Sequence, residues 1–392
     1  MISVSLIWFG KSGWRFLQVL LHRQHTKWDI KINAVCDSNP DRLSDLKKLW
    51  LKTFSNLNEM FDSWDSEIFI VSTNEDSHFD IISEIKKNSK KYKKIIVEKL
   101  LVENIEQAEQ LLHIFQDHEI SINFVERHSI IIEKFKKWIH ENDVYISRAS
   151  FKRGKYRLHD SRPTVGVLSE ISHPLDLILM LSDTSTNTSF RIINWSYTYS
   201  DYSNVSKPLL DSIDININFD NGLNINGWWS FLWDSRERKI ILFLSNKHKM
   251  VQFMVVLEFD KPHRDIDKCI IYDIWFNNWG ERKVIKTFEV KKEQIEPEVL
   301  CVSKILNLIT ENIKEIKGWY KSNAIAHLEQ WVYIQKIIEQ LKTEAEKNNA
   351  KTEIFGNINK PQVKKSTSDK LLYEYLQWKD IKEKMVMRDE EF

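Results

Sequence analysis

Cysteine is scarce in this chain of 392 residues, which has only Cys36, Cys269 and Cys301 and no paired spacing between them. A disulfide framework and a cysteine-based zinc site are therefore excluded, no metal site is predicted, and a reducing, cytoplasmic compartment is expected. No apolar run reaches the roughly 18 residues that a transmembrane helix needs. Charge of one sign is also lacking, because 57 Lys plus Arg offset 56 Asp plus Glu. We therefore expect neither a nucleic acid nor a membrane as the main partner.

Glycine is the other scarce residue, with nine in the whole chain, about 2% against a usual value of about 7%. Each glycine in a loop is therefore more informative than usual. What the chain does have is 42% hydrophobic and 29% charged residues, the balance of a soluble protein with a large core. Its length predicts two domains, or three small ones.

The first part of the chain alternates short β-rich runs with helical patterns, which is typical of parallel βαβ units. Strands are predicted over 3–9, 30–36, 68–72, 94–97 and 121–125, and helices over 14–23, 41–50, 78–86 and 105–116. Residues 1–125 are therefore predicted to form an α/β domain with a doubly wound parallel sheet.

The pattern changes after about Phe151, and residues 126–343 are predicted to form an α+β domain with a large, mostly antiparallel open sheet. Residues 212–219 alternate apolar and polar side chains, and Asp220-Asn221-Gly222 then signals a hairpin before the strand 223–231. Further strands are predicted over 191–199, 239–244, 250–259, 269–276 and 283–290, and helices over 303–316 and 324–342. Residues 344–392 are predicted to form a charged tail with a terminal helix from Ser368, either a tethered surface helix or a docking arm for another subunit.

A glycine loop, Gly10-Lys11-Ser12-Gly13, directly follows the first predicted strand and precedes Trp14. Glycines at this point let the backbone approach a pyrophosphate that sits at the N-terminus of the next helix. Two of the three glycines of GxGxxG are present, and Trp8 replaces the first. The loop is therefore a candidate dinucleotide site.

Asp37 ends the second predicted strand, 24 residues beyond Gly13, where a carboxylate accepts hydrogen bonds from ribose hydroxyls. An alternative role for Asp37 is to cap the helix after Asn39-Pro40. Asp37 and the neighbouring Ser38 are thus candidate cofactor-binding residues. Since a carboxylate repels a 2′-phosphate, Asp37 favours NAD over NADP.

Two more predicted strands deliver polar residues to the same edge of the sheet, where ligands of open α/β sheets bind. One ends in Ser72-Thr73-Asn74 and leads to His78 at a helix start, and the other ends in the pair Glu98-Lys99. Lys99 is therefore expected to point toward the site.

Together these segments resemble the Gfo/Idh/MocA oxidoreductase family, which is marked by a glycine loop, a TPxxxH pattern and a strand ending in EKP. Here the last two read Thr73-Asn74-Glu75-Asp76-Ser77-His78 and Glu98-Lys99-Leu100, and the resemblance spans about residues 3–340. It implies an N-terminal Rossmann domain, a C-terminal sheet for substrate binding and oligomer contacts, and NAD(P)-linked redox chemistry on sugars or polyols. It also implies cofactor contacts from the residues after these strands and from Arg127 near the domain junction.

A second matching segment, residues 166–177, resembles the family's acidic residue followed by HxxD. On a helix, Glu170, His173 and Asp176 share one face, so the ring would lie between two carboxylates that favour the imidazolium. The resemblance implies that Lys99 and His173 are catalytic and contact the substrate, with Glu170 and Asp176 positioning the ring. Because Pro174 is tolerated only near a helix start, residues 170–173 are alternatively a turn.

Several residues depart from the family pattern: Trp8 replaces a Gly, Asn74 and Leu100 replace prolines, and Ser169 stands where many members have Asp. Arg153 and Arg162 are further substrate-binding candidates, since a guanidinium would pair with a phosphate or carboxylate.

The sequence therefore predicts an NAD(P)-dependent oxidoreductase that moves a hydride between nicotinamide and a hydroxyl or keto carbon of a sugar, sugar nucleotide or related polyol. A homodimer or homotetramer through the C-terminal sheet is expected. Two alternatives stay open: an imine or ketone reductase in a natural-product pathway, and a non-catalytic NAD(P)-binding regulator of the same family.

Overall fold

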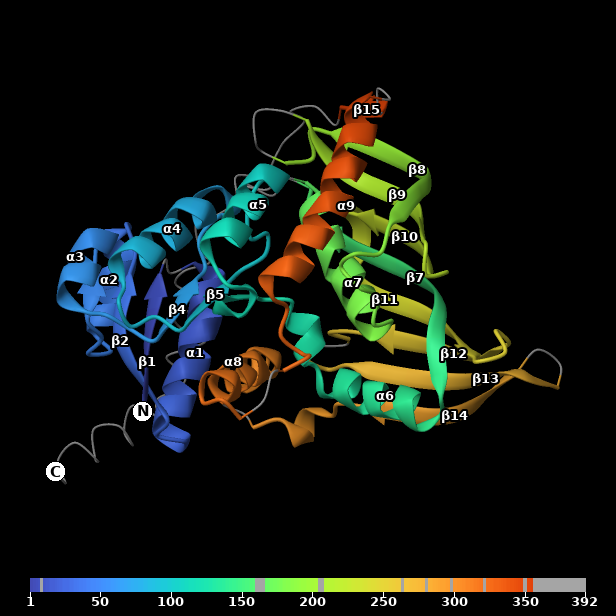
Figure 1. The fold of residues 1–392 in the computed structure, drawn as a ribbon, viewed down its shortest axis with the longest axis horizontal. Helices are drawn as coiled ribbons and strands as arrows, with labels where there is room; N and C mark the ends of the chain where they lie inside the picture. The colour runs from blue at the N-terminus through green and yellow to red at the C-terminus, as the bar shows by residue number, and fades with distance from the viewer. Residues whose placement is uncertain are drawn as a thin grey trace.

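The computed structural model describes residues 1–7, 10–158, 166–203, 208–261, 264–278, 281–296, 299–319, 322–347 and 351–354. Trp8, Arg162 and the terminal helix expected from Ser368 lie outside the described residues. The described chain forms two sheets that stand side by side with helices between and around them (Figure 1).

The N-terminal sheet has six parallel strands in the order β3-β2-β1-β4-β5-β6. Its strands are β1 (Ile2–Ile7), β2 (Ile30–Cys36), β3 (Thr53–Phe54), β4 (Ile68–Val71), β5 (Lys94–Val97) and β6 (Ile120–Ile122). The helices are α1 (Lys11–Thr26), α2 (Pro40–Lys47), α3 (Leu57–Ser63), α4 (His78–Asn88) and α5 (Ile105–Ile114). This is the strand order of a dinucleotide-binding fold, and it confirms the doubly wound sheet.

Buried apolar strands and side-chain caps account for several of these elements. Both β4 and β5 are buried along their whole length, as expected of parallel strands that are covered on two faces. The side chains of Asn39, Asn56 and Asn104 each accept a backbone N–H bond at the start of a helix. β3 was not predicted, because its two residues are too few to show an alternation, and α3 was not predicted either.

The second sheet has nine strands in the order β14-β13-β12-β11-β7-β10-β9-β8-β15. They are β7 (Val144–Tyr156), β8 (Phe190–Ser200), β9 (Leu209–Phe219), β10 (Asn224–Ser230), β11 (Leu232–Asn246), β12 (Val251–Glu258), β13 (Lys268–Asn278), β14 (Glu281–Glu289) and β15 (Lys351–Glu353). Most pairs are antiparallel, as predicted; β7 with β10 and β8 with β15 are parallel. The predicted turn between β9 and β10 is present, and Gly222 takes a φ of +89° there.

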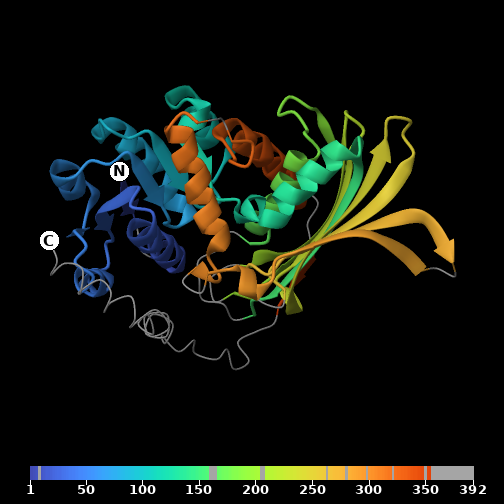
Figure 2. The same ribbon diagram turned by 90° about the horizontal axis from the view of Figure 1, so that it is seen from below.

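One face of the nine-stranded sheet is covered by helices that separate it from the first sheet (Figure 2). These are α6 (Ile130–Glu141), α7 (Leu168–Leu181) and α9 (Leu328–Lys347). The last helix also reaches the first sheet, because α9 contacts α5 and a bridge joins Ile122 of β6 to Ala326. The two sheets are therefore packed onto a shared helical layer.

Helix α8 (Ser303–Ile316) follows the second sheet in sequence but packs against α1 of the first. Its apolar residues Ile305, Leu308 and Ile309 join a buried cluster with Leu17 and Leu20 of α1. No described helix is long and apolar enough to cross a membrane.

Candidate active site

A cavity of about 480 Å³ opens where the carboxyl ends of β5 and β6 face the second sheet. From the first sheet and α1 it is lined by Ser12, Glu98, Lys99 and Asn123, among others. From β7 and α7 it is lined by Lys155, Glu170 and His173, among others. The predicted residues Lys99, Glu170 and His173 thus come together, although Lys99 follows β5 of the first sheet and the other two lie on α7.

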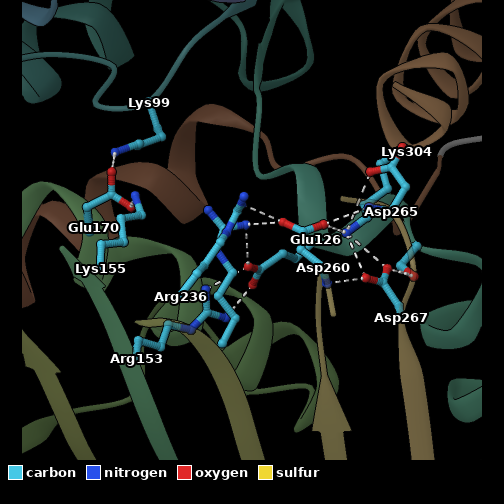
Figure 3. A network of polar contacts seen from close by, with 12 residues as sticks. Lys99, Glu126, Arg153, Lys155, Glu170, Arg236, Asp260, Asp265, Asp267 and Lys304 are labelled. Atoms are coloured by element: carbon cyan, nitrogen blue, oxygen red, sulfur yellow. Dashed lines mark hydrogen bonds and ion pairs between the residues drawn. The ribbon is translucent and has the colours of Figure 1, made fainter. Parts of the chain in front are cut away.

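Glu170 holds two lysines in this cavity (Figure 3). Its Oε1 lies 3.2 Å from Lys99 Nζ, and its Oε2 lies 2.6 Å from Lys155 Nζ. Lys99 Nζ also donates to the carbonyl oxygen of Ser169 at 3.0 Å. Burial alone would raise the pKa of Glu170, but Lys155 and Lys99 outweigh it and hold that pKa well below its usual range. Glu170 is therefore a carboxylate that fixes the position of both ammonium groups.

Lys155, the second lysine held by Glu170, was not predicted as a residue of the site. Burial lowers the pKa of Lys155 to about 7, while the Glu170 carboxylate partly opposes that effect. A signal for it exists in the sequence, since Phe151, Arg153 and Lys155 alternate on one face of β7.

His173 is 7% exposed, packs edge-on against Phe124, and has no hydrogen-bond partner for Nδ1 among the described residues. Burial and the nearby Lys99 lower the pKa of His173 to about 3, and Glu126 and Glu170 oppose them only in part. The ring is therefore neutral at pH 7. The expectation of an imidazolium is wrong, because Glu170 is engaged by the two lysines rather than by the ring.

Asp176 does not reach His173 either. Its carboxylate pairs with Arg127, whose Nε and Nη2 donate over 2.6 and 2.5 Å, and this pair lines a separate cavity of about 360 Å³. Arg127 also donates to the carbonyl of Ile325 at 3.3 Å. The expected contact of Asp176 with the ring has no counterpart among the described hydrogen bonds, and the cofactor contact of Arg127 stays a prediction.

Helix α7 runs without a break from Leu168 to Leu181 and contains Pro174. The alternative of a turn over residues 170–173 is therefore wrong. Pro174 has no N–H to donate to the carbonyl of Glu170 four residues earlier. Every residue of the helix is buried, so tertiary packing stabilises the helix in spite of this missing bond.

The glycine loop begins α1 with features that suit a phosphate. Gly10 is the N-cap, without a side-chain cap, and no acidic residue lies in the first turn. No described atom lies within 4 Å of the place that a Cβ on Gly10 would occupy. Gly13 is buried in this turn, and Ser12 Oγ donates to Glu98, which also accepts from Asn123 Nδ2 at 2.9 Å. The backbone N–H groups of this turn thus fit a dinucleotide pyrophosphate.

At the end of β2, Asp37 is fully buried, and both oxygens of its carboxylate have partners within the chain. Its Oδ1 accepts from the backbone N–H of Asn39 at 2.7 Å, and its Oδ2 lies 3.1 Å from Arg42 Nη1. Asn39, rather than Asp37, caps α2. Ser38 beside it is exposed.

The residues that follow β4 lie at the carboxyl edge of the first sheet. Ser72 is buried, and Asn74 precedes the short helix η1 (Glu75–Ser77) without a side-chain cap. Thr73 Oγ1 donates to the carbonyl of Asn74, and His78 Nδ1 lies 2.6 Å from the carbonyl oxygen of Leu100. Burial lowers the pKa of His78, so its ring is neutral and joins the ends of β4 and β5.

Arg153 lies behind the cavity rather than in it. It is fully buried and forms a two-pronged pair with Glu126, which also lies 3.4 Å from Arg238 Nη1. Figure 3 shows how this pair continues through Asp260 to Lys304. Among the described residues, the arginines that line the cavity are instead Arg15, Arg157, Arg236, Arg238 and Arg264, and none of these was predicted.

Sequence comparison identifies the first sheet. Residues 2–124 match the oxidoreductase family with an NAD-binding Rossmann fold, Gfo/Idh/MocA. Residues 2–124 thus carry the NAD-binding domain of this family. The N-terminal sheet is therefore an NAD(P)-binding Rossmann fold, and the glycine loop and strand ends described above have the chemistry to hold that cofactor. No curated protein matches the chain.

Solved structures share the fold of nearly the whole chain at low identity. The UDP-N-acetylglucosamine 3-dehydrogenase GnnA from Acidithiobacillus ferrooxidans has a TM-score of 0.64 at 13% identity, over 87% of this chain and 97% of that chain. The 3-ketoreductase KijD10 from Actinomadura kijaniata, in complex with NADP and TDP-benzene, has a TM-score of 0.65 at 11% identity, over 91% and 99%. The transcriptional regulator Gal80p from Kluyveromyces lactis has a TM-score of 0.68 at 15% identity, over 88% and 90%.

Within the described residues, no group of three or more His, Cys, Asp or Glu side chains is arranged to hold a metal ion.

Proposed function

We propose that this protein is an NAD(P)-dependent oxidoreductase of the Gfo/Idh/MocA family acting at a hydroxyl or keto carbon of a sugar, sugar nucleotide or related polyol. The observation that carries the proposal is the meeting of Lys99, Glu170 and His173 in one cavity with the Rossmann strand ends. Bound NAD(P) would supply the hydride acceptor or donor. The residues of the glycine loop, the end of β2 and the end of β4 would hold it.

The chain's own groups supply proton transfer and orientation. Lys99 Nζ, fixed by Glu170 and by the Ser169 carbonyl, would donate a hydrogen bond to the reacting oxygen of the substrate. His173 is neutral at pH 7 and its Nδ1 has no partner among the described residues, so it is able to accept the hydroxyl proton during oxidation. In reduction the ammonium of Lys99, which would contact the same oxygen, would supply the proton.

Lys155 has a place in this scheme that the sequence did not suggest. With a pKa near 7, it is able to exchange a proton with its surroundings at neutral pH, and Glu170 connects it to Lys99. We assign it the role of a positioning residue that sets the charge around Lys99.

Two variants test the proposal. Lys99→Met and His173→Asn are expected to lower kcat by at least about 100-fold. NADH affinity, followed by energy transfer from tryptophan, should change less than about threefold. Lys152→Met, half-exposed on the other face of β7, is the matched control and should retain full activity. Unchanged turnover in both test variants would contradict the assignment.

A non-catalytic regulator is the second candidate, and the fold similarity to Gal80p favours it. It predicts that NADH or NADPH binds in the micromolar range while a panel of sugars, polyols and sugar nucleotides shows no turnover. Turnover of any member of that panel, lost in Lys99→Met, would rule it out.

A further inference from the structure

Lys155 is an amine inside the cavity to which the proposed reaction gives only a positioning role. It lies on β7, and 21% of its side chain is exposed at the wall of the cavity that also holds Lys99 and His173. Figure 3 shows the two lysines reaching the Glu170 carboxylate from different parts of the fold. A small molecule in the cavity would therefore have access to the Lys155 amine.

Two lysines share one carboxylate here. Lys155 Nζ lies 2.6 Å from Glu170 Oε2, and Lys99 Nζ lies 3.2 Å from Glu170 Oε1. Lys99 also donates to the Ser169 carbonyl, whereas the part of the chain that the structure describes gives Lys155 no hydrogen-bond acceptor besides Glu170. Two ammonium groups thus face a single negative charge, and Lys155, which has fewer acceptors, loses its proton more easily.

The surroundings of Lys155 favour its neutral form. Burial lowers the pKa of Lys155 to about 7, and Glu170 opposes this effect only in part. The nearby cations Arg238, Lys99 and Arg157 also lower that pKa. An ordinary lysine has a pKa of about 10.4, so at pH 7 the neutral fraction of Lys155 is roughly a thousandfold larger. A neutral amine beside a second cation is the form of lysine that attacks carbonyl carbons and forms imines.

We propose that Lys155 is a nucleophile that condenses reversibly with an aldehyde or a ketone in this cavity, so that the protein holds a carbonyl compound covalently as an imine. The inference goes beyond the proposed function, because imine formation needs neither NAD(P) nor hydride transfer. Lys99 and Lys155 contact the two oxygens of one carboxylate, so a carbonyl group whose oxygen accepts from Lys99 would have the second amine beside it.

The condensation balances without an oxidant or a reductant. The lone pair of the neutral Lys155 Nζ forms a bond to the carbonyl carbon, and the π electrons of the C=O bond move to the oxygen, which takes a proton from the Lys99 ammonium. The nitrogen then gives a proton back to Lys99 through Glu170, which contacts both lysines. Water leaves with a second proton from Lys99 while the nitrogen lone pair forms the C=N bond, and the iminium proton returns Lys99 to its ammonium form. Amine and carbonyl compound thus give imine and water.

The test traps the imine by reduction. Protein free of cofactor is incubated with dihydroxyacetone, a small neutral ketone, and with cyanoborohydride, which delivers a hydride to the C=N carbon and leaves a stable secondary amine. Peptide mass spectrometry then locates the labelled lysines, each of which gains the mass of the ketone less one oxygen atom. Lys155 should be labelled at least about tenfold faster at pH 7 than the half-exposed Lys152, and its labelling rate should rise through an inflection near pH 7.

Variants at the neighbouring residues test the cause of the reactivity. Lys99→Met removes a cation and leaves Glu170 to Lys155 alone, so the pKa of Lys155 should rise and its labelling at pH 7 should fall by about tenfold. His173→Asn, in which the proposed redox reaction is lost, should keep the Lys155 label within about twofold. Lys152→Met, on the other face of β7, is the matched control and should also keep it. A thermal melt of each variant checks that it is folded.

Equal labelling of Lys155 and Lys152 in the wild type would overturn the inference, as would a Lys155 labelling rate without an inflection below about pH 9. An undiminished label in Lys99→Met would overturn it too, because the neighbouring cation would then have no part in the reactivity. Since no cofactor is present, a lack of turnover with every substrate would not remove the label, and a lack of label would leave the redox assignment of Lys99 and His173 as it stands.

Discussion

Replacing Glu126 by Gln should destabilise the protein by about 3 kcal/mol at pH 7. The side chains of Glu126 and Arg153 are 2% and 0% exposed, and their two-pronged pair joins the helix η3 (Val125–His128) to the centre of the second sheet. Burial alone would raise the pKa of Glu126, but Arg153 outweighs it, and the pKa falls from 4.5 to about 2. At 1.36 kcal/mol per pKa unit, this corresponds to about 3 kcal/mol, similar to the roughly 3–5 kcal/mol typical of breaking a buried pair.

The pH dependence follows from the sign of that shift. A carboxylate with a depressed pKa contributes its full stability above pH 4.5, and the contribution is lost as the pH falls toward 2. The difference in the free energy of unfolding between the wild type and Glu126→Gln should therefore fall to about 2 kcal/mol at pH 3.5. Urea unfolding followed by tryptophan fluorescence at the two pH values measures it.

The control for this experiment is Glu237→Gln, on β11 next to Arg238, which contacts Glu126. Glu237 pairs with Lys152 at 3.3 Å, and the side chains are 25% and 48% exposed. A pair this accessible contributes about 0–1 kcal/mol. A loss below about 1 kcal/mol in Glu126→Gln at pH 7, or a difference that grows on acidification, would refute the reasoning.

Three further predictions concern the site and the sheet. Lys155→Met should remove an inflection near pH 7 from the pH profile of kcat/KM, and a profile identical to the wild type would count against a role for Lys155. Asp37→Ala should weaken NADH binding by roughly tenfold and reduce the preference for NADH over NADPH, as measured by energy transfer from tryptophan. An NADH affinity equal to that of the wild type would show that Asp37 has only a structural role. Gly227→Ala should cost about 1–3 kcal/mol in urea unfolding, since its Cβ would lie 1.9 Å from the Phe151 ring; an unchanged midpoint would show that the ring moves freely.

The Rossmann sheet was predictable because its strands are short, wholly apolar runs separated by helical patterns. β2, β5 and α8 occupy the predicted residues. β7 was missed for a physical reason, although it lies near the centre of the second sheet. Its buried positions shift by one residue at the bulge near Ser147. At its end, the positions that face inward hold the cations Arg153 and Lys155, so the apolar alternation typical of a strand is interrupted.

The site was predictable only where residues follow one another in a motif. Lys99, Glu170 and His173 carry the family pattern and do come together. The cations of the cavity were hidden, because Arg236 and Arg264 lie far along the chain, and only the pairing of β11 with β7 brings Arg236 to the cavity. The charge of His173 was also hidden, since the sequence does not tell which cation each carboxylate will pair with.

The packing of α8 against α1 has a consequence for dividing this chain into fragments. A fragment made of residues 1–125 would contain every strand of the Rossmann sheet but would lack Ile305, Leu308 and Ile309 of α8, which belong to the same buried cluster as Leu17 and Leu20 of α1. Such a fragment should aggregate or bind hydrophobic dyes, and adding residues 299–319 as a separate peptide should restore its solubility. The first sheet is therefore completed by a segment made about 200 residues later, so during synthesis it must wait for nearly the whole chain before its surface is closed.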